Sequence, residues 1–176
     1  MTPALPAGLR MLSSSKAHAA VFRADLSLLL WGRGFTVEEV LAFGATLRAE
    51  LGGAKRTAAL VWLTDLPASV PTEPVREALA KLISQSPPSF TGLTYIVESG
   101  DFGSATARSV ITGLNLLAKP SLKVAVHATV RDALQSFTPA LGWSEAEVAE
   151  LSRGLIAARA AWAAAGGTPV NERARG

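Results

Sequence analysis

The chain has 176 residues, 49% of them hydrophobic and 18% charged, which is enough to bury a full core in one domain. It contains no cysteine, which excludes disulfides, thiolate metal sites and cysteine nucleophiles. The net charge of +3 is spread along the chain, without the clustered basic face that is typical of nucleic-acid-binding proteins. We therefore expect a globular protein that does not bind nucleic acid.

Residues 1–16 are rich in proline, glycine and serine, and this composition predicts a flexible leader. The segment has no apolar stretch after a basic start, so it does not resemble a signal peptide. No apolar run reaches the roughly 18 residues that a membrane-spanning helix needs. We therefore expect a cytoplasmic protein without a membrane span. The frequent use of alanine and arginine is typical of a GC-rich bacterial genome.

The first half of the chain predicts a hairpin, a helix and a buried strand. Two apolar runs, 18–23 and 26–31, are separated by two residues, as in a β-hairpin. Thr36 and Glu39 have the spacing of a capping box, and apolar residues then recur every three or four positions until a pair of glycines ends the helix. The run 58–63 is apolar on both faces, which is typical of a strand inside a sheet.

The second half continues the alternation of helices and strands. The expected elements are a helix at 72–83, a strand at 93–97, a helix at about 104–117, a strand at 122–126, a short helix from 129 and a long helix at about 144–165. Strands that are joined by helices of this length run parallel through crossover connections. We therefore predict an α/β fold: a mixed five-stranded sheet with an antiparallel opening hairpin, flanked by helices, and a flexible tail at 167–176.

This order of elements resembles the STAS fold of bacterial anti-sigma-factor antagonists and sulfate-transporter tails, and is similar to a group of little-characterised STAS-like proteins from myxobacteria. The resemblance covers residues 17–141. The segments that carry it are Leu30-Trp31-Gly32, the helix capped by Thr36, Leu60-Val61-Trp62-Leu63 running to Asp65, Tyr95-Ile96-Val97, and Val124-Ala125-Val126 before Thr129. The resemblance implies a non-catalytic regulatory module that binds a signalling protein through the loop after the central strand.

The loop after the central strand departs from the family pattern. The antagonists carry an Asp-Ser-Gly-like segment whose hydroxyl is phosphorylated, whereas this chain has Asp65-Leu-Pro-Ala-Ser69 followed by Thr72. We therefore interpret it as a recognition loop for a protein partner, with Asp65, Ser69, Thr72 and Arg76 as partner-binding or switch residues. In a purely structural role, Asp65 would order the loop and Thr72 would cap the following helix.

An alternative hypothesis is a site for a small anionic or lipid-like ligand at the C-terminal edge of the sheet, with Arg33, Arg76 and Arg108 as candidate charges. The glycines around Arg33 lack the third glycine of a dinucleotide-binding loop. The two histidines, His18 and His127, lie far apart in the sequence, and no nucleophile–base or metal-ligand pattern is present. We therefore expect no catalytic activity, cofactor or metal.

Residues 142–166 add a long helix after the STAS-like segment. Its apolar stripe includes Trp143, Leu151, Leu155 and Trp162. The helix either packs on the domain as one more core helix or forms a dimer or partner interface, where tryptophan and arginine are enriched. The sequence leaves both alternatives open.

Overall fold

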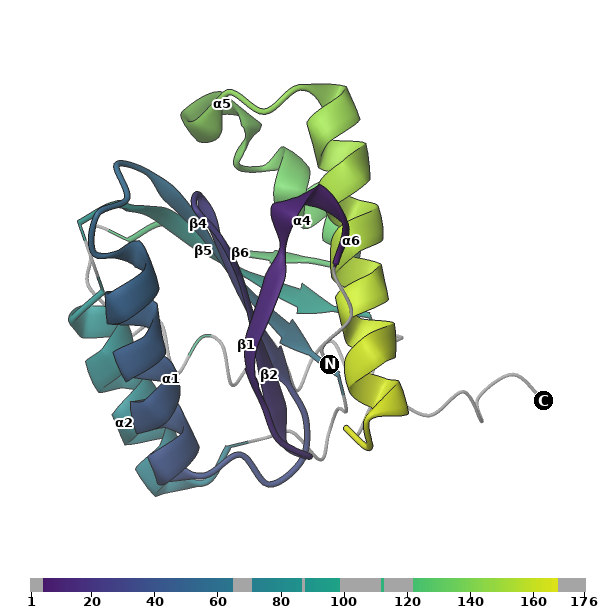
Figure 1. Ribbon diagram of the computed structural model, residues 1–176. Helices are drawn as coiled ribbons and strands as arrows, with labels where there is room; N and C mark the ends of the chain where they lie inside the picture. Colours follow the sequence, from purple (N-terminus) through teal and green to yellow (C-terminus); the bar gives the residue numbers. More distant parts are fainter. Residues whose placement is uncertain (1–4, 65–70, 87, 99–111, 113–121, 168–176) are drawn as a thin grey trace.

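The computed structural model describes residues 5–64, 71–86, 88–98, 112 and 122–167, and has an α/β architecture in which helices flank a mixed six-stranded sheet (Figure 1). The strands are β1 (Arg10–Ser14), β2 (His18–Arg23), β3 (Leu26–Trp31), β4 (Thr57–Leu63), β5 (Phe90–Val97) and β6 (Val124–His127). The helices are η1 (Pro6–Gly8), α1 (Val37–Leu51), α2 (Glu73–Ser84), α4 (Val130–Gln135), α5 (Thr138–Leu141) and α6 (Glu145–Ala164).

The strands follow one another across the sheet in sequence order, β1-β2-β3-β4-β5-β6. The predicted hairpin is confirmed, because His18 pairs with Trp31 and Arg23 with Leu26 in antiparallel register. From β3 to β6 every neighbouring pair is parallel, as the crossover connections require. The strand β4 lies between β3 and β5, which explains why its sequence is apolar on both faces.

The sheet has six strands instead of the predicted five, because the expected leader contains β1. This strand pairs antiparallel with β2, with an irregularity between Met11 and Ser13. All five of its residues are at least partly exposed, and its two apolar residues, Met11 and Leu12, are too few to give a strand signal. The strand forms because β2 offers it a complete backbone partner, and because the preceding Leu9 is buried in the core.

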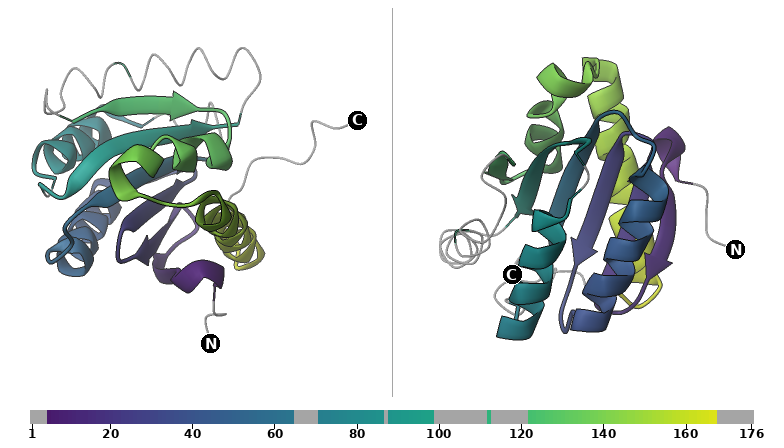
Figure 2. Two further views of the ribbon diagram at one scale, coloured as in Figure 1. Left: turned by 90° about the horizontal axis from the view of Figure 1, so that it is seen from above. Right: turned by 90° about the vertical axis from the view of Figure 1, so that its left-hand side faces the viewer.

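Each face of the sheet carries its own apolar core (Figures 1 and 2). The helices α1 and α2 cover one face and connect neighbouring parallel strands; right-handed crossovers place such helices on the same side. The helices α4 and α6 follow β6 and cover the opposite face. Helix packing therefore leaves the outer surfaces of α1 and α2 on one side of the molecule and that of α6 on the other.

The helix starts follow the local sequence. At α1 the Thr36 hydroxyl accepts the Glu39 N–H at 3.3 Å, and the Glu39 carboxylate accepts the Thr36 N–H at 2.9 Å. At α6 Ser144 and Glu147 form the same reciprocal pair, with distances of 3.3 and 2.8 Å. Each box satisfies two backbone donors that no residue within the helix can pair with.

The four stripe residues of the C-terminal helix are buried inside the chain's own core, which corrects their assignment to a dimer interface. The indole N–H of Trp143 donates to Asp25 Oδ2 at 2.7 Å, and that of Trp162 donates to the Ser15 carbonyl at 2.7 Å. The other two, Leu151 and Leu155, are fully buried. Both ends of α6 are thus fastened to turns of the sheet, and the first alternative, packing on the domain, is the one the fold adopts.

Several expectations lie outside the described residues: the loop positions Asp65 and Ser69, the helix at about 104–117 with Arg108, and the tail from 168 onwards. The strand expected at 93–97 begins earlier, at Phe90, and the last strand is Val124–His127. Within the described part of the chain, no helix combines the length and the apolar character that crossing a membrane requires.

Candidate functional site

Two of the predicted partner-binding residues are described by the structure, and they lie where the parallel strands end. Thr72 and Arg76, at the start of α2, are exposed. Thr72 has the extended backbone of an N-cap residue, but its side chain makes no capping hydrogen bond. Its hydroxyl is therefore not the structural cap that the sequence favoured, and Thr72 and Arg76 share one accessible surface.

The predicted ligand-binding arginines are only partly covered by the structure. Arg33 is exposed in the loop between β3 and α1. Since β3 and β4 are parallel neighbours, the residues that follow them reach the same edge, so Arg33 and the start of α2 lie on one side of the molecule. Arg108, the third candidate, is outside the described residues.

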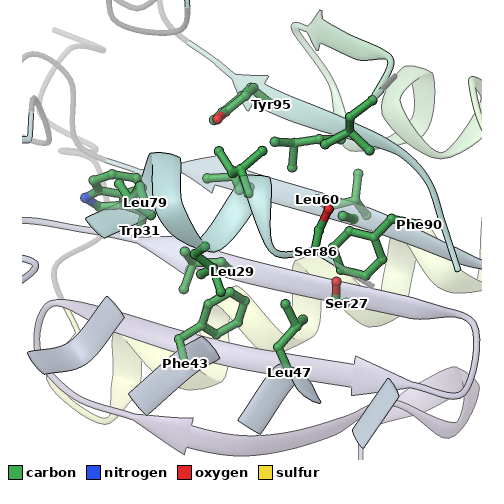
Figure 3. A pocket seen from close by; sticks show the side chains of 16 residues that line it. Ser27, Leu29, Trp31, Phe43, Leu47, Leu60, Leu79, Ser86, Phe90 and Tyr95 are labelled. Carbon is green, nitrogen blue, oxygen red and sulfur yellow. The ribbon is translucent and has the colours of Figure 1, made fainter. Parts of the chain in front are cut away.

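An apolar cavity of about 50 Å³ lies between the sheet and the helices α1 and α2 (Figure 3). Phe43 and Leu47 of α1, Leu79 of α2, and Leu29 and Tyr95 of the sheet contribute to its walls. Burial raises the pKa of the Tyr95 hydroxyl, which therefore stays neutral. A void with such walls excludes water and favours apolar occupants.

An open groove of about 580 Å³ runs along the outer side of the same helix pair. Leu41 of α1 lies in it with 60% of its surface exposed. Further along the groove are two exposed cations, Arg48 of α1 and Lys81 of α2. Neither forms an ion pair with another residue that the structure describes. The groove thus has an apolar half towards the helix N-termini and a basic half towards their C-termini.

Sequence reasoning missed a partly buried polar cluster formed by Ser15, His18 and Glu39. The Ser15 hydroxyl donates to Glu39 Oε1 at 2.6 Å, and His18 Nδ1 lies 3.1 Å from each of these oxygens. In a catalytic triad the serine and the carboxylate meet opposite ring nitrogens, whereas here both meet Nδ1. The cluster therefore lacks the arrangement of a catalytic triad, and its hydrogen bonds tie the β1–β2 turn to α1. No sequence signal links residues that lie more than 20 positions apart.

The electrostatics of this cluster suit that structural role. Burial alone would raise the pKa of Glu39, but hydrogen bonds from Ser15 and from the Thr36 backbone outweigh it, so the pKa lies below its usual range. The carboxylate thus remains charged near neutral pH and keeps its partners. Among the described residues, no group of three histidine, aspartate or glutamate side chains could hold a metal ion.

At the opposite edge of the sheet, a second open cleft is lined by Arg23, Asp25, Arg56 and the segment around Ala140. Arg23 donates two hydrogen bonds to Asp25, at 2.5 and 2.6 Å, and its guanidinium lies 5.5 Å from the centre of the Trp143 ring. Arg56 donates to the Ala140 carbonyl at 2.8 Å. These arginines hold turns together, so the cleft is a weaker candidate than the α1–α2 groove.

No protein-family model, curated protein or solved structure matches this chain. The α/β architecture is therefore established by the structure alone, and the STAS-like assignment remains a prediction from the order of elements. The function is accordingly inferred from the surfaces described above.

Proposed function

We propose that this protein is a non-catalytic regulatory module that binds a protein partner through the N-terminal helix surface. We define this surface as Val37, Leu41 and Pro74, which line the groove, together with the exposed Thr72 and Arg76 at the start of α2. The observation that carries the proposal is Leu41, a large apolar side chain that is 60% exposed in an open groove. Exposed apolar surface that is contiguous and rimmed by polar groups is a common mark of an interaction site.

The position of this surface also supports the proposal. It lies where the parallel strands end, the edge at which open α/β sheets usually bind their partners or ligands. Arg76 adds an exposed positive charge near the start of α2. A suitable partner would place an apolar side chain on Leu41 and an acidic group opposite Arg76, because arginine pairs well with carboxylates.

The test is a comparison of two variants in capture experiments from lysate of the source cells. Leu41→Glu puts a charge in the centre of the proposed contact, and we expect it to reduce capture of the specific partner roughly tenfold or more. The melting temperature should change little, because Leu41 is exposed. Quantitative mass spectrometry of the captured proteins measures the difference.

The matched control is Ile156→Glu, whose side chain is 53% exposed on α6, the helix that covers the opposite face of the sheet. It makes the same chemical change at a similarly exposed apolar residue. We expect Ile156→Glu to retain every protein that the wild type captures. Equal losses in both variants, or no protein lost specifically from Leu41→Glu, would contradict the proposal.

A further inference from the structure

One side chain lines both the apolar cavity and the outer groove. This is Leu82 of α2, which is half-buried. Opposite it lies Gly44 of α1, where a Cβ atom would stand 2.8 Å from Leu82 Cδ1. The missing side chain at Gly44 therefore gives the end of Leu82 its place between the helices. A change of the Leu82 rotamer is the simplest movement that could connect the cavity with the groove.

The cavity suits the end of an alkyl chain. Its volume of about 50 Å³ compares with roughly 150 Å³ for an engineered apolar cavity that binds benzene, so it has room for a few carbon atoms. Of the described side chains that line it, only those of Ser27, Trp31, Ser86 and Tyr95 carry a polar atom. The Ser27 hydroxyl already donates to the Ala58 carbonyl at 3.5 Å. Burial of methylene groups is the favourable interaction that such walls provide.

The groove outside Leu82 suits a negative charge. Arg48 folds back over the helix, with Nη1 3.6 Å from where a Cβ of Gly44 would be. Lys81 lies on the facing helix and lines the same groove. One acidic residue, Glu77, also lines the groove, one turn before Lys81. The two cations outnumber this acid, so the local charge favours an anion.

We propose that the cavity and the basic half of the groove form one binding site for an alkyl chain with an anionic head. The chain enters between α1 and α2 past Leu82 and places its end in the cavity, while the head binds Arg48 and Lys81. Carboxylate and phosphate heads share this chemistry. The site does not depend on the proposed partner binding, since it uses the C-terminal half of the helix pair and not the N-terminal helix surface.

Three eight-carbon probes test the site in the absence of any partner: octanoate, octyl phosphate and the neutral octanol. Methyl-resolved NMR of the full chain follows Leu82, Leu79 and Leu47 during each titration. We expect saturable shifts of these methyl signals with at least one anionic probe, and weaker binding of octanol. The tighter anionic probe identifies the kind of head. Absence of saturable shifts with both anions up to millimolar concentration would overturn the proposal.

Variants separate the two parts of the site. Ala59→Val adds two methyl groups at the cavity wall. It should lower the affinity for the anionic probe roughly tenfold, because about two methylene groups of the alkyl chain can no longer be buried in the cavity. This variant must keep a cooperative thermal transition to be informative, and the probe titrations of the wild type test the site independently of it. Full-strength binding in a folded blocking variant would overturn insertion into the cavity.

The head group is tested by the exposed double variant Arg48→Gln and Lys81→Gln. It should weaken the anionic probe roughly three- to tenfold and leave octanol unchanged, because two exposed charge contacts are lost. The matched control is Arg131→Gln on α4, an exposed arginine on the other face of the sheet, which should change nothing. Equal weakening of octanol and the anion in the double variant would overturn the role of the charges.

Discussion

At the scale of single residues, Asp25 links a hairpin turn to the last helix. Its carboxylate accepts two hydrogen bonds from Arg23 and one from the Trp143 indole. Burial alone would raise the pKa of Asp25, but these hydrogen bonds outweigh it and hold the pKa below its usual value. The charged form is therefore favoured by folding, and the stability of the protein should depend on it.

This residue gives a pH prediction. Because the pKa of Asp25 is lower in the folded chain than in the unfolded chain, its contribution to stability is complete above the unfolded value of about 4. It is lost as the pH falls through the folded pKa. We expect Asp25→Asn to have a lower melting temperature than the wild type at pH 7. At pH 3 the difference between the two melting temperatures should be smaller. Thermal unfolding followed by circular dichroism measures both, and a constant gap across this range would contradict the assignment.

Residue chemistry also explains which helix starts could be predicted. Thr36 and Ser144 are each followed three positions later by a glutamate, and both cap their helices. Thr72 is followed at that spacing by Val75, which cannot return a hydrogen bond, and its hydroxyl does not cap. The full capping-box pattern was thus a reliable guide, and threonine alone was not.

At the scale of elements, the contact between α6 and the N-terminal segment holds β1, the edge strand that the sequence did not predict. Gly154 of α6 faces this segment: a Cβ there would lie 2.6 Å from Leu9 Cδ1 and 3.1 Å from the Pro6 carbonyl oxygen. The backbone of η1 therefore packs directly on the helix, which a larger residue would prevent. No periodic pattern in the sequence could reveal this close approach, because it joins segments about 145 positions apart.

We predict that Gly154→Val detaches the segment that leads into β1. The added side chain would clash with backbone atoms, so the amides of residues 9–14 should exchange with solvent at least tenfold faster. Ala160→Val, an exposed position on the same helix, makes the same kind of substitution without the clash and should leave this exchange unchanged. Hydrogen exchange followed by mass spectrometry measures these rates. Unaltered protection in Gly154→Val would show that the contact between α6 and the N-terminal segment is not needed to hold β1.

At the scale of the whole molecule, the fold is one sheet with two separate cores, and the expected leader belongs to one of them. Leu9 is 3% exposed within the core under α6, whereas Leu12, three residues later, is 37% exposed. The two leucines lie in the same short segment and differ mainly in burial. They therefore offer a direct test of how firmly the N-terminal segment is part of the folded unit.

We expect Leu9→Ala to reduce the free energy of unfolding by about 2–5 kcal/mol, the range typical of a buried leucine. Leu12→Ala should reduce the free energy of unfolding by less than about 1 kcal/mol, because the Leu12 side chain is exposed. Urea denaturation measures both values. A small and equal loss in the two variants would mean that residues before β2 contribute little to the core.

The sequence by itself determined the local order of this protein: the hairpin, the capped helices and the parallel strands, because each is written in the spacing of neighbouring residues. It could not show that the segment Arg10–Ser14 joins the sheet as an edge strand, since the pairing with the backbone of β2 is a long-range contact that five partly exposed residues do not announce. The sequence also could not decide whether α6 packs on the domain or forms an interface, because an apolar stripe can be buried in either way. Only the tertiary structure shows that this stripe is buried in the chain's own core. It also brings Gly44, Arg48, Lys81 and Leu82 close together between α1 and α2, since contacts between helices depend on how the sheet sets their separation.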